Sequence, residues 1–217
     1  MRDRGKELVA ELKKMQKEFL PLDEEERHEY FNERRDEFNA RLAGGLRHSA
    51  LFIFLNKTSN ANYRTNGNGK FNGAYNHLLN PGICDERTIL ADSKLLQNVE
   101  IMTGDFEQTF EKIEGNTFFY FDPPYRPLSN TSSFNSYAKE DFNDDAQVRL
   151  KLFCDKLNRH GVDFMLSNSD CLGKNGTDRF FDDLFIDYRI ERVMASRNVN
   201  AIASKRGKLT EIVVGNY

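Results

Sequence analysis

The sequence predicts an α/β fold in which a helical part comes first and a sheet with accompanying helices follows. Two observations carry this prediction. Apolar residues recur at helical spacing within residues 1–40, whereas the second half alternates short apolar runs with longer amphipathic stretches. Such alternation is typical of strands covered by helices. We expect a helical and hairpin subdomain over residues 1–98 and a sheet domain over residues 99–217.

Two helices are predicted at the start of the chain. Apolar residues from Leu8 to Leu20 share one helical face, and Pro21 helps to end this helix because proline lacks a backbone N–H. Asp23 followed by Glu26 fits a capping box that opens the second helix. The apolar run 46–55 comes next, and its periodicity alone does not decide between helix and strand.

A hairpin is predicted over Tyr63–Phe71, because Asn66-Gly67-Asn68-Gly69 supplies the Asn-Gly chemistry of a tight turn. The later elements follow from short apolar runs and helical spacing. Expected helices cover residues 85–97, 106–113, 142–159 and 177–184. Expected strands cover residues 99–103, 117–121, 162–167, 188–193 and 211–214, and the first two of these are expected to be buried.

Composition argues against several classes of protein. With 217 residues, 39% of them hydrophobic, the chain is long enough to bury a substantial core. No apolar run approaches the roughly 18 residues of a membrane span, and no secretory signal follows Met1. The three cysteines and four histidines lack the spacing of a metal site or a disulfide framework. We therefore expect a cytoplasmic protein with no membrane contact and no metal.

The distribution of charge points to one part of the chain. Net charge is −3, so contact with a nucleic acid has to come from local patches. Residues 189–208 carry six Lys or Arg against the single acid Glu191. This asymmetry suits a nucleic-acid face in the C-terminal half, and a solvated basic surface explains it equally well.

The most informative motif is Asp122-Pro123-Pro124-Tyr125, which follows the apolar run Phe118–Phe121. Proline fixes its own φ and restricts the residue before it, so the loop is stiff and its carbonyl groups stay free to accept hydrogen bonds. A carboxylate, a carbonyl and an aromatic ring then converge, which suits the two N–H donors and flat face of a base amine. The alternative is a proline turn after a buried strand, with Tyr125 as packing.

Several ordered segments resemble the Dam-like DNA adenine-N6 methyltransferases over nearly the whole chain. They are Leu51–Thr58, Asn66–Asn72, Gly104–Phe106, Asp122–Tyr125, Leu166–Asp170, Arg206–Glu211 and Asn216–Tyr217. The resemblance implies a Rossmann-like methyltransferase sheet, S-adenosylmethionine as methyl donor and double-stranded DNA as substrate. It also implies that the apolar run over residues 46–55 is a helix. A restriction-modification, phage or housekeeping role is left open.

The resemblance also implies roles for individual residues. In catalysis, Asp122, Pro123, Pro124 and Tyr125 hold and stack the adenine. For the cofactor, Asp105 contacts the adenine amino group and Phe106 its ring, with Asp122 at the edge of the site. The alternative for Asp105 and Phe106 is a helix N-cap followed by a core side chain. We interpret Asn168 and Asp170 as residues that keep the shape of their loop.

Target recognition is expected from polar residues in two segments. The candidates are Asn60, Arg64, Lys70, Asn72, Arg197, Lys205, Arg206 and Lys208. Arginine, lysine and asparagine can reach phosphates or base edges, and a solvated polar surface is the alternative. The family's aromatic residue after Asn-Lys-Thr is missing here, so the resemblance does not predict the target sequence.

The largest departure from the family is the absence of its Phe-x-Gly-x-Gly turn and of the acidic residue that follows it. We therefore expect a sheet that is incomplete on its N-terminal side, and a separate chain as one source of the missing strands. A catalytically silent DNA-binding subunit, or a truncated remnant, is the alternative from another class. A methylase that acts on RNA or another amine is a third.

Overall fold

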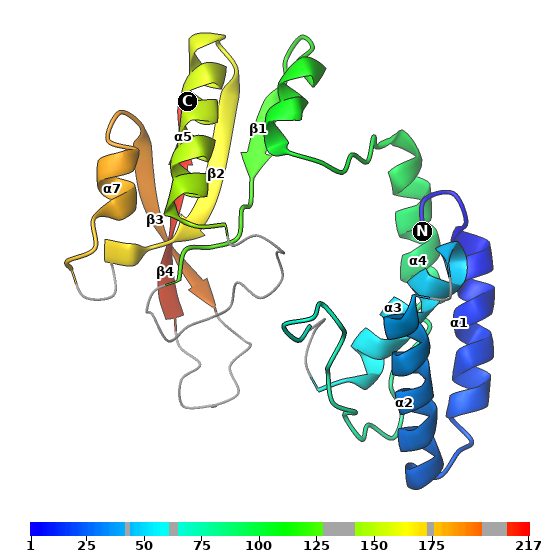
Figure 1. Ribbon diagram of the computed structural model, residues 1–217. Coiled ribbons are helices and arrows are strands. Elements are labelled where there is room, and N and C mark those ends of the chain that lie inside the picture. Colours follow the sequence, from blue (N-terminus) through cyan, green and yellow to red (C-terminus); the bar gives the residue numbers. More distant parts are fainter. Residues whose placement is uncertain (42–43, 61–64, 128–141, 173–175, 197–207) are drawn as a thin grey trace. The chain divides into compact units, whose positions relative to one another are not determined.

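The computed structural model describes the chain except for residues 42–43, 61–64, 128–141, 173–175 and 197–207 (Figure 1). The chain divides into two compact units, Met1–Met102 and Thr103–Tyr217. Within the described ranges, no helix is long and apolar enough to cross a membrane.

The first unit is helical, as predicted. Its α-helices are α1 (Gly5–Phe19), α2 (Glu24–Ala40), α3 (Gly45–Thr58) and α4 (Glu86–Leu95), and a 3-10 helix over Leu96–Asn98 follows α4. The predicted capping box is confirmed at the start of α2. Asp23 Oδ1 accepts from the Glu26 N–H at 2.9 Å, and Glu26 Oε2 accepts from the Asp23 N–H at 3.0 Å. These two bonds satisfy donors that the first turn of a helix leaves unpaired.

Aromatic side chains form the centre of the first unit. α3 contacts both α1 and α2, and its Phe54 is fully buried between them. The ring of Phe54 meets Phe19 edge-on at 5.4 Å and Tyr30 at 5.6 Å between ring centroids. Apolar run 46–55 is therefore a helix, as the family resemblance implies.

The predicted hairpin is a turn closed by one isolated antiparallel bridge, between Thr65 and Phe71. The Asn66 backbone N–H donates to the Lys70 carbonyl at 2.8 Å. Asn39 of α2 holds Phe71 by both backbone groups: its Oδ1 accepts from the N–H at 2.7 Å, and its Nδ2 donates to the carbonyl at 2.9 Å. The turn is thus tied to the helical core and adds no regular strand in the described ranges.

The second unit is built on a four-stranded mixed sheet of order β1-β2-β4-β3. The strands are β1 (Phe118–Phe121), β2 (Asp163–Ser169), β3 (Arg189–Ser196) and β4 (Lys208–Gly215). β1 is parallel to β2, and the other two pairings are antiparallel. The α-helix α5 (Asp144–Arg159) packs on β2, and the short helix α7 (Phe180–Leu184) follows that strand in the chain. This architecture confirms the predicted α/β fold.

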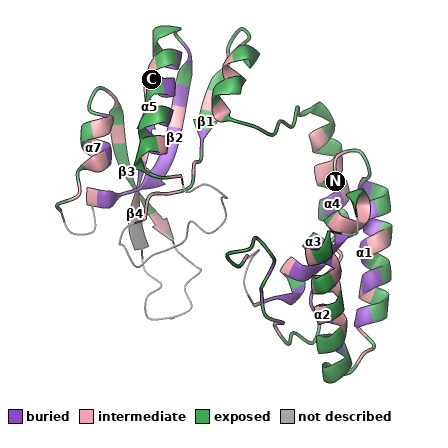
Figure 2. Cartoon of the chain, viewed as in Figure 1, coloured by how far each residue is buried: buried purple, intermediate pink, exposed green. Residues whose placement is uncertain are grey.

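Burial follows the order of the strands (Figure 2). β2 is buried along most of its length because it has a strand on each side and α5 across it. β1 lies at the edge, and the prediction that it is buried is wrong for Phe118 and Tyr120, which are 50% and 57% exposed. Of the four β1 residues only Phe121 is buried.

Two other predicted elements need correction. Residues 99–103 form no strand, and Val99, Ile101 and Met102 are exposed. A strand needs a neighbour to accept its hydrogen bonds, and no described strand pairs with this segment. The helix expected over residues 106–113 is a 3-10 helix over Phe106–Lys112, in which Asp105 is the N-cap.

Candidate active site

The Asp122–Tyr125 loop leaves β1 at the carboxyl edge of the sheet. Phe121 of β1 is opposite Leu166 of β2, and the two strands run parallel, so both end at the same edge. Open α/β sheets bind ligands at this edge. Asp122 is exposed, whereas residues 167–169 at the end of β2 are buried polar side chains.

Ser167 holds one oxygen of the Asp122 carboxylate. Its buried hydroxyl donates to Asp122 Oδ1 at 3.2 Å, and the Tyr120 hydroxyl lies 3.2 Å from Ser167 Oγ. With Ser167 donating to Asp122, Tyr120 donates to Ser167. Among the described residues no donor reaches Asp122 Oδ2, so this oxygen can accept from a substrate.

Buried amides and a hydroxyl hold the backbone that follows Asp122. Gln147 Nε2 donates to the Pro124 carbonyl at 3.1 Å. Asn168 Oδ1 accepts from the Arg126 N–H at 3.0 Å, and Ser169 Oγ donates to the Arg126 carbonyl at 2.6 Å. Gln147, Asn168 and Ser169 are 1%, 0% and 1% exposed. Asn168 therefore keeps the shape of its surroundings, as predicted.

The Pro123 carbonyl is the exception in this loop. In the part of the chain that the structure describes, no donor reaches its oxygen, whereas the next carbonyl, that of Pro124, is bound by Gln147. The loop thus offers two acceptors, Asp122 Oδ2 and the Pro123 oxygen. Two acceptors match the two N–H groups of an exocyclic amine.

The Arg126 side chain anchors the end of the loop. Its guanidinium donates to Asp144 at 2.7 Å and to Asp178 at 2.5 Å, and it lies 4.5 Å from the centroid of the Phe180 ring. The hydrogen bonds that Arg126 donates to these carboxylates raise its pKa, the one to Asp144 contributing most. Arg126 therefore joins the loop to the start of α5 and the segment before α7.

Asp170 is a second buried anchor. The side chain is almost fully buried, and its Oδ1 accepts from Arg192 Nε at 3.1 Å. Arg192 also binds both oxygens of Asp182, at 2.7 and 2.8 Å. Asp170 thus ties the end of β2 to β3 and α7, as expected of a residue that keeps the loop in shape.

Tyr125 lies partly buried beside the same edge. Its hydroxyl is 3.5 Å from Glu211 Oε2 on β4. Burial raises the pKa of Tyr125, and the negative charges of Glu211 and Asp122 add to this rise. The hydroxyl stays protonated at neutral pH, so the side chain presents a neutral aromatic ring.

Asp105 is the N-cap of the 3-10 helix. Its Oδ1 accepts from the Glu107 N–H at 3.0 Å, and Arg149 of α5 donates to its Oδ2 at 2.6 Å. These hydrogen bonds, the backbone one first, hold the pKa of Asp105 below its usual value. Phe106 lies under the Arg149 guanidinium, 4.6 Å from the ring centroid, and meets Phe153 edge-on. The geometry fits the N-cap alternative, and a cofactor role stays a prediction.

The predicted DNA-binding residues fall into three groups. Asn60 Nδ2 donates to the Tyr75 carbonyl at 3.1 Å, so this amide ties two backbone segments together. Lys70 and Asn72 are exposed on the turn. Arg64, Arg197, Lys205 and Arg206 lie outside the described residues. Lys208 is the first residue of β4, and its side chain is likewise not described.

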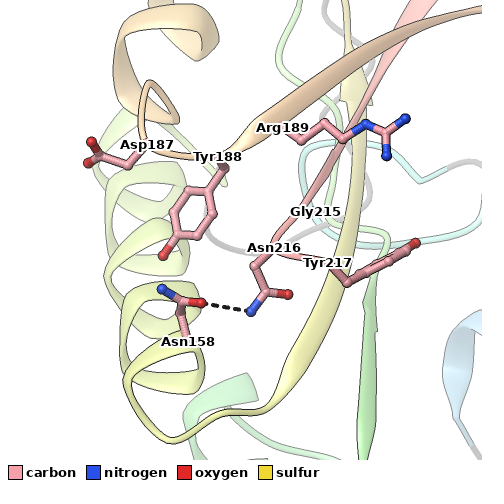
Figure 3. A pocket seen from close by; sticks show the side chains of 7 residues that line it. All are labelled: Asn158, Asp187, Tyr188, Arg189, Gly215, Asn216 and Tyr217. Carbon is pink, nitrogen blue, oxygen red and sulfur yellow. Dashed lines mark hydrogen bonds between the residues drawn. The ribbon is translucent and has the colours of Figure 1, made fainter.

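A pocket of about 230 Å³ lies at the other end of the strands, where β3 begins and β4 ends (Figure 3). Asn216 lines it, where its Nδ2 donates to Asn158 Oδ1 at 2.9 Å and its Oδ1 accepts from the Phe164 N–H at 2.8 Å. The hydroxyl of Tyr188 is bound to Asp155 at 2.7 Å. These polar groups are thus paired within the protein, and Asn216 joins the segment after β4 to α5 and β2. Within the described ranges no cluster of His, Cys, Asp or Glu fits a metal ion.

Sequence reasoning missed Ser167, Gln147 and Arg126. Ser167 and Arg126 adjoin predicted residues, but nothing local indicates their partners. Gln147 carries a usable signal: it lies on the buried face of α5 together with Leu150 and Leu157. A polar residue within an apolar helical stripe has to find a hydrogen-bond partner inside the protein.

Comparison with known proteins gives consistent matches. Residues 1–199 match the family model of D12 class N6 adenine-specific DNA methyltransferases. The chain is 44% identical over 214 residues to the type II methyltransferase M.MjaIII of Methanocaldococcus jannaschii, covering 97% of this chain and 72% of that protein. It is 39% identical over 173 residues to the type II methyltransferase M1.LlaDCHI of Lactococcus lactis, which covers 79% of this chain and 58% of that protein. A DNA adenine methylase of Haemophilus influenzae is 27% identical over 190 residues, covering 85% and 62%.

The ion pair between Arg126 and Asp178 predicts a pH-dependent stability. Burial raises the pKa of Asp178, but hydrogen bonds from Arg126 and the Phe180 N–H outweigh it, so the folded-state pKa lies below its usual value. The stabilisation is therefore complete above the unfolded-state pKa of about 3.9 and is lost as pH falls through the folded-state pKa. Asp178→Asn should lower the free energy of unfolding at pH 7, and the difference from wild type should shrink below about pH 4.

Urea unfolding at pH 7, 5, 4 and 3 measures this difference. Asp183→Asn is the matched control, because Asp183 pairs with Arg179 where both side chains are more than half exposed. Such exposed pairs contribute little. A difference for Asp178→Asn that persists unchanged to pH 3 would show that its charge does not stabilise the fold.

Proposed function

Since the chain belongs to the D12 class of N6 adenine-specific DNA methyltransferases, we propose that it transfers a methyl group from S-adenosylmethionine to the N6 atom of adenine in duplex DNA. The matches confirm the predicted resemblance to Dam-like enzymes. One observation supports the assignment of the site above all: a buried hydrogen-bond network holds the loop, and no donor among the described residues reaches Asp122 Oδ2 or the Pro123 carbonyl.

In this proposal the loop holds the amine of an adenine that has left the base stack. Asp122 Oδ2 and the Pro123 oxygen accept its two N–H groups, and Tyr125 stacks on the base. Ser167 keeps the other Asp122 oxygen occupied, which fixes the direction of the carboxylate. Orientation of this kind lowers the barrier by placing the reacting atoms in line.

The cofactor supplies a methyl group bonded to a positively charged sulfur. With the cofactor bound, Asp122 and the Pro123 carbonyl would hold N6 in line with this methyl group as it passes from sulfur to N6, and the proton that N6 loses would pass through Asp122 Oδ2 to solvent. Asp122 need not be a strong base, because the amine is far more acidic once it is methylated and positively charged. We assign Asp105 and Phe106 to the adenine of the cofactor, although Arg149 already binds Asp105.

The residues present suit such a cofactor in part. Asp105 and Asp122 are exposed carboxylates, which favour a positively charged ligand. The relatives named type II methyltransferases suggest a restriction-modification role for this chain. Asn60, Arg64, Lys70 and Asn72, together with Arg197, Lys205, Arg206 and Lys208, remain our proposed DNA contacts.

Further strands are proposed to pair with β1. Among the described strands this one lies at an edge of the sheet, and its Phe118 and Tyr120 are half exposed. An open edge with apolar side chains is a template for another strand. We propose a separate polypeptide as the source of these strands.

Asp122→Ala should abolish methyl transfer while DNA binding persists. The change removes an acceptor of the amine and none of the proposed DNA contacts, and loss of one preorganised polar group costs about 10²-fold or more in kcat. Radiolabelled methyl transfer and fluorescence anisotropy measure the two properties. Asp163→Ala, an exposed carboxylate at the other end of β2, is the control. Normal turnover by Asp122→Ala would remove the catalytic assignment.

Lys208→Gln should weaken binding to all DNA sequences alike. A lysine that contacts a phosphate contributes about one unit to the slope of log K against log[salt]. Titrations at several salt concentrations measure the slope, and Lys14→Gln, an exposed lysine of α1, is the charge-matched control. Loss of preference for one sequence over another would mean that Lys208 reads bases.

Completing the sheet should strengthen cofactor binding. Calorimetry should give weak S-adenosylmethionine binding by the purified chain, since Asp105 and Asp122 are the only assigned polar contacts. A polypeptide that carries a Phe-x-Gly-x-Gly strand and turn should restore binding and methylation together. Micromolar binding by the chain alone would contradict the proposal. DNA binding without methyl transfer, even with the added polypeptide, would favour the silent DNA-binding subunit.

A further inference from the structure

Gln147 uses both ends of its amide inside the protein. It lies on the buried face of α5 and is 1% exposed. Its Nε2 donates to the Pro124 carbonyl at 3.1 Å, and its Oε1 accepts from Asn168 Nδ2 at 3.2 Å. A buried amide that is paired at both ends has a fixed orientation, because leaving either end unpaired inside the protein is costly.

The orientation of Gln147 is coupled to that of Asn168. Since Asn168 donates to Gln147 through Nδ2, its Oδ1 faces the other way, toward the N–H groups of Arg126 at 3.0 Å and Ser169 at 2.9 Å. Turning either amide over would set donor against donor or acceptor against acceptor. The amides of Gln147 and Asn168 therefore have a single favourable orientation, in which they hydrogen-bond to the loop at both Pro124 and Arg126.

We propose that Gln147 is a positioning residue for methyl transfer, which sets the direction of the Pro123 carbonyl without touching the substrate. The inference rests on the proposed function. Gln147 and Asn168 immobilise the backbone from Pro124 to Arg126. The ring of Pro124 locks its own φ, so an immobilised Pro124 also restricts the preceding peptide and its free Pro123 oxygen.

The variant Gln147→Glu tests this positioning role, because only the protonated form of the introduced carboxyl group can donate to the Pro124 carbonyl. A neutral glutamic acid offers one O–H donor and one carbonyl acceptor, enough for the two hydrogen bonds that Gln147 makes here, whereas the carboxylate has no donor for the Pro124 carbonyl. Burial raises the pKa of an introduced carboxyl group. The charged groups that the described residues place around the loop are Asp122, Arg126, Asp144, Asp178 and Glu211, with the Asp170–Arg192 pair behind it and Arg149, Lys151 and Asp155 further along α5. All are present in wild type, so the ratio of variant to wild type isolates position 147.

At neutral pH, Gln147→Glu should lower kcat by about 10²-fold, the effect of a small misplacement of reacting groups. The KM for DNA should change little, since no DNA contact is removed. The ratio of variant to wild-type kcat should then rise as pH falls. Gln147→Leu, which cannot donate at any pH, should show the loss without the recovery. Leu150→Ala is the matched control, because this buried residue of the same helix lies in the apolar core.

Three kinetic results would overturn the proposal. They are normal kcat in both Gln147 variants, a pH profile of Gln147→Glu that parallels that of Gln147→Leu, and a loss of kcat in Leu150→Ala as large as in the Gln147 variants.

Hydrogen exchange of the Arg126 amide separates the inference from the proposed function. Faster exchange in Gln147→Leu than in wild type would support the clamp, and unchanged exchange would contradict it. A wild type that methylates no DNA in any preparation refutes the proposed function instead.

Discussion

The site depends on the parallel pairing of β1 with β2. This pairing sets Phe121 opposite Leu166, so that Asp122 leaves the sheet where Ser167 and Asn168 end the neighbouring strand. Residues more than forty positions apart thereby come within hydrogen-bond distance. β2 holds this place because it has a strand on each side and α5 across it, which gives it the most buried position in the sheet.

Around this edge the protein separates rigidity from chemistry. The polar groups of Gln147, Asn168 and Ser169 are buried and form hydrogen bonds with other groups of the protein. Asp122 is exposed, and within the described part of the chain one of its oxygens has no donor. Because unpaired buried polar groups are costly, the buried set resists rearrangement and holds the exposed acceptor in place. A preformed site of this kind needs little reorganisation when a substrate arrives.

Most helices and their ends were predictable, since local signals determine them. The capping box at Asp23 and the end of the first helix before Pro21 need only neighbouring residues. The strand expected over residues 99–103 was wrong, because apolar residues suit a strand only where a neighbour supplies hydrogen bonds. β1 formed but stayed half exposed for a related reason: the pattern shows a strand and not its place in the sheet.

For the candidate site, the sequence by itself determined the loop motif, its stiffness and the chemistry of its groups, all of which belong to four adjacent residues. Only the tertiary structure decided which groups stay free. Ser167 occupies one oxygen of Asp122, and Gln147 binds the Pro124 carbonyl from a position 23 residues further along the chain. Asp105 likewise met Arg149 of α5. Such pairings depend on how the helix packs against the sheet, and no local pattern encodes that contact.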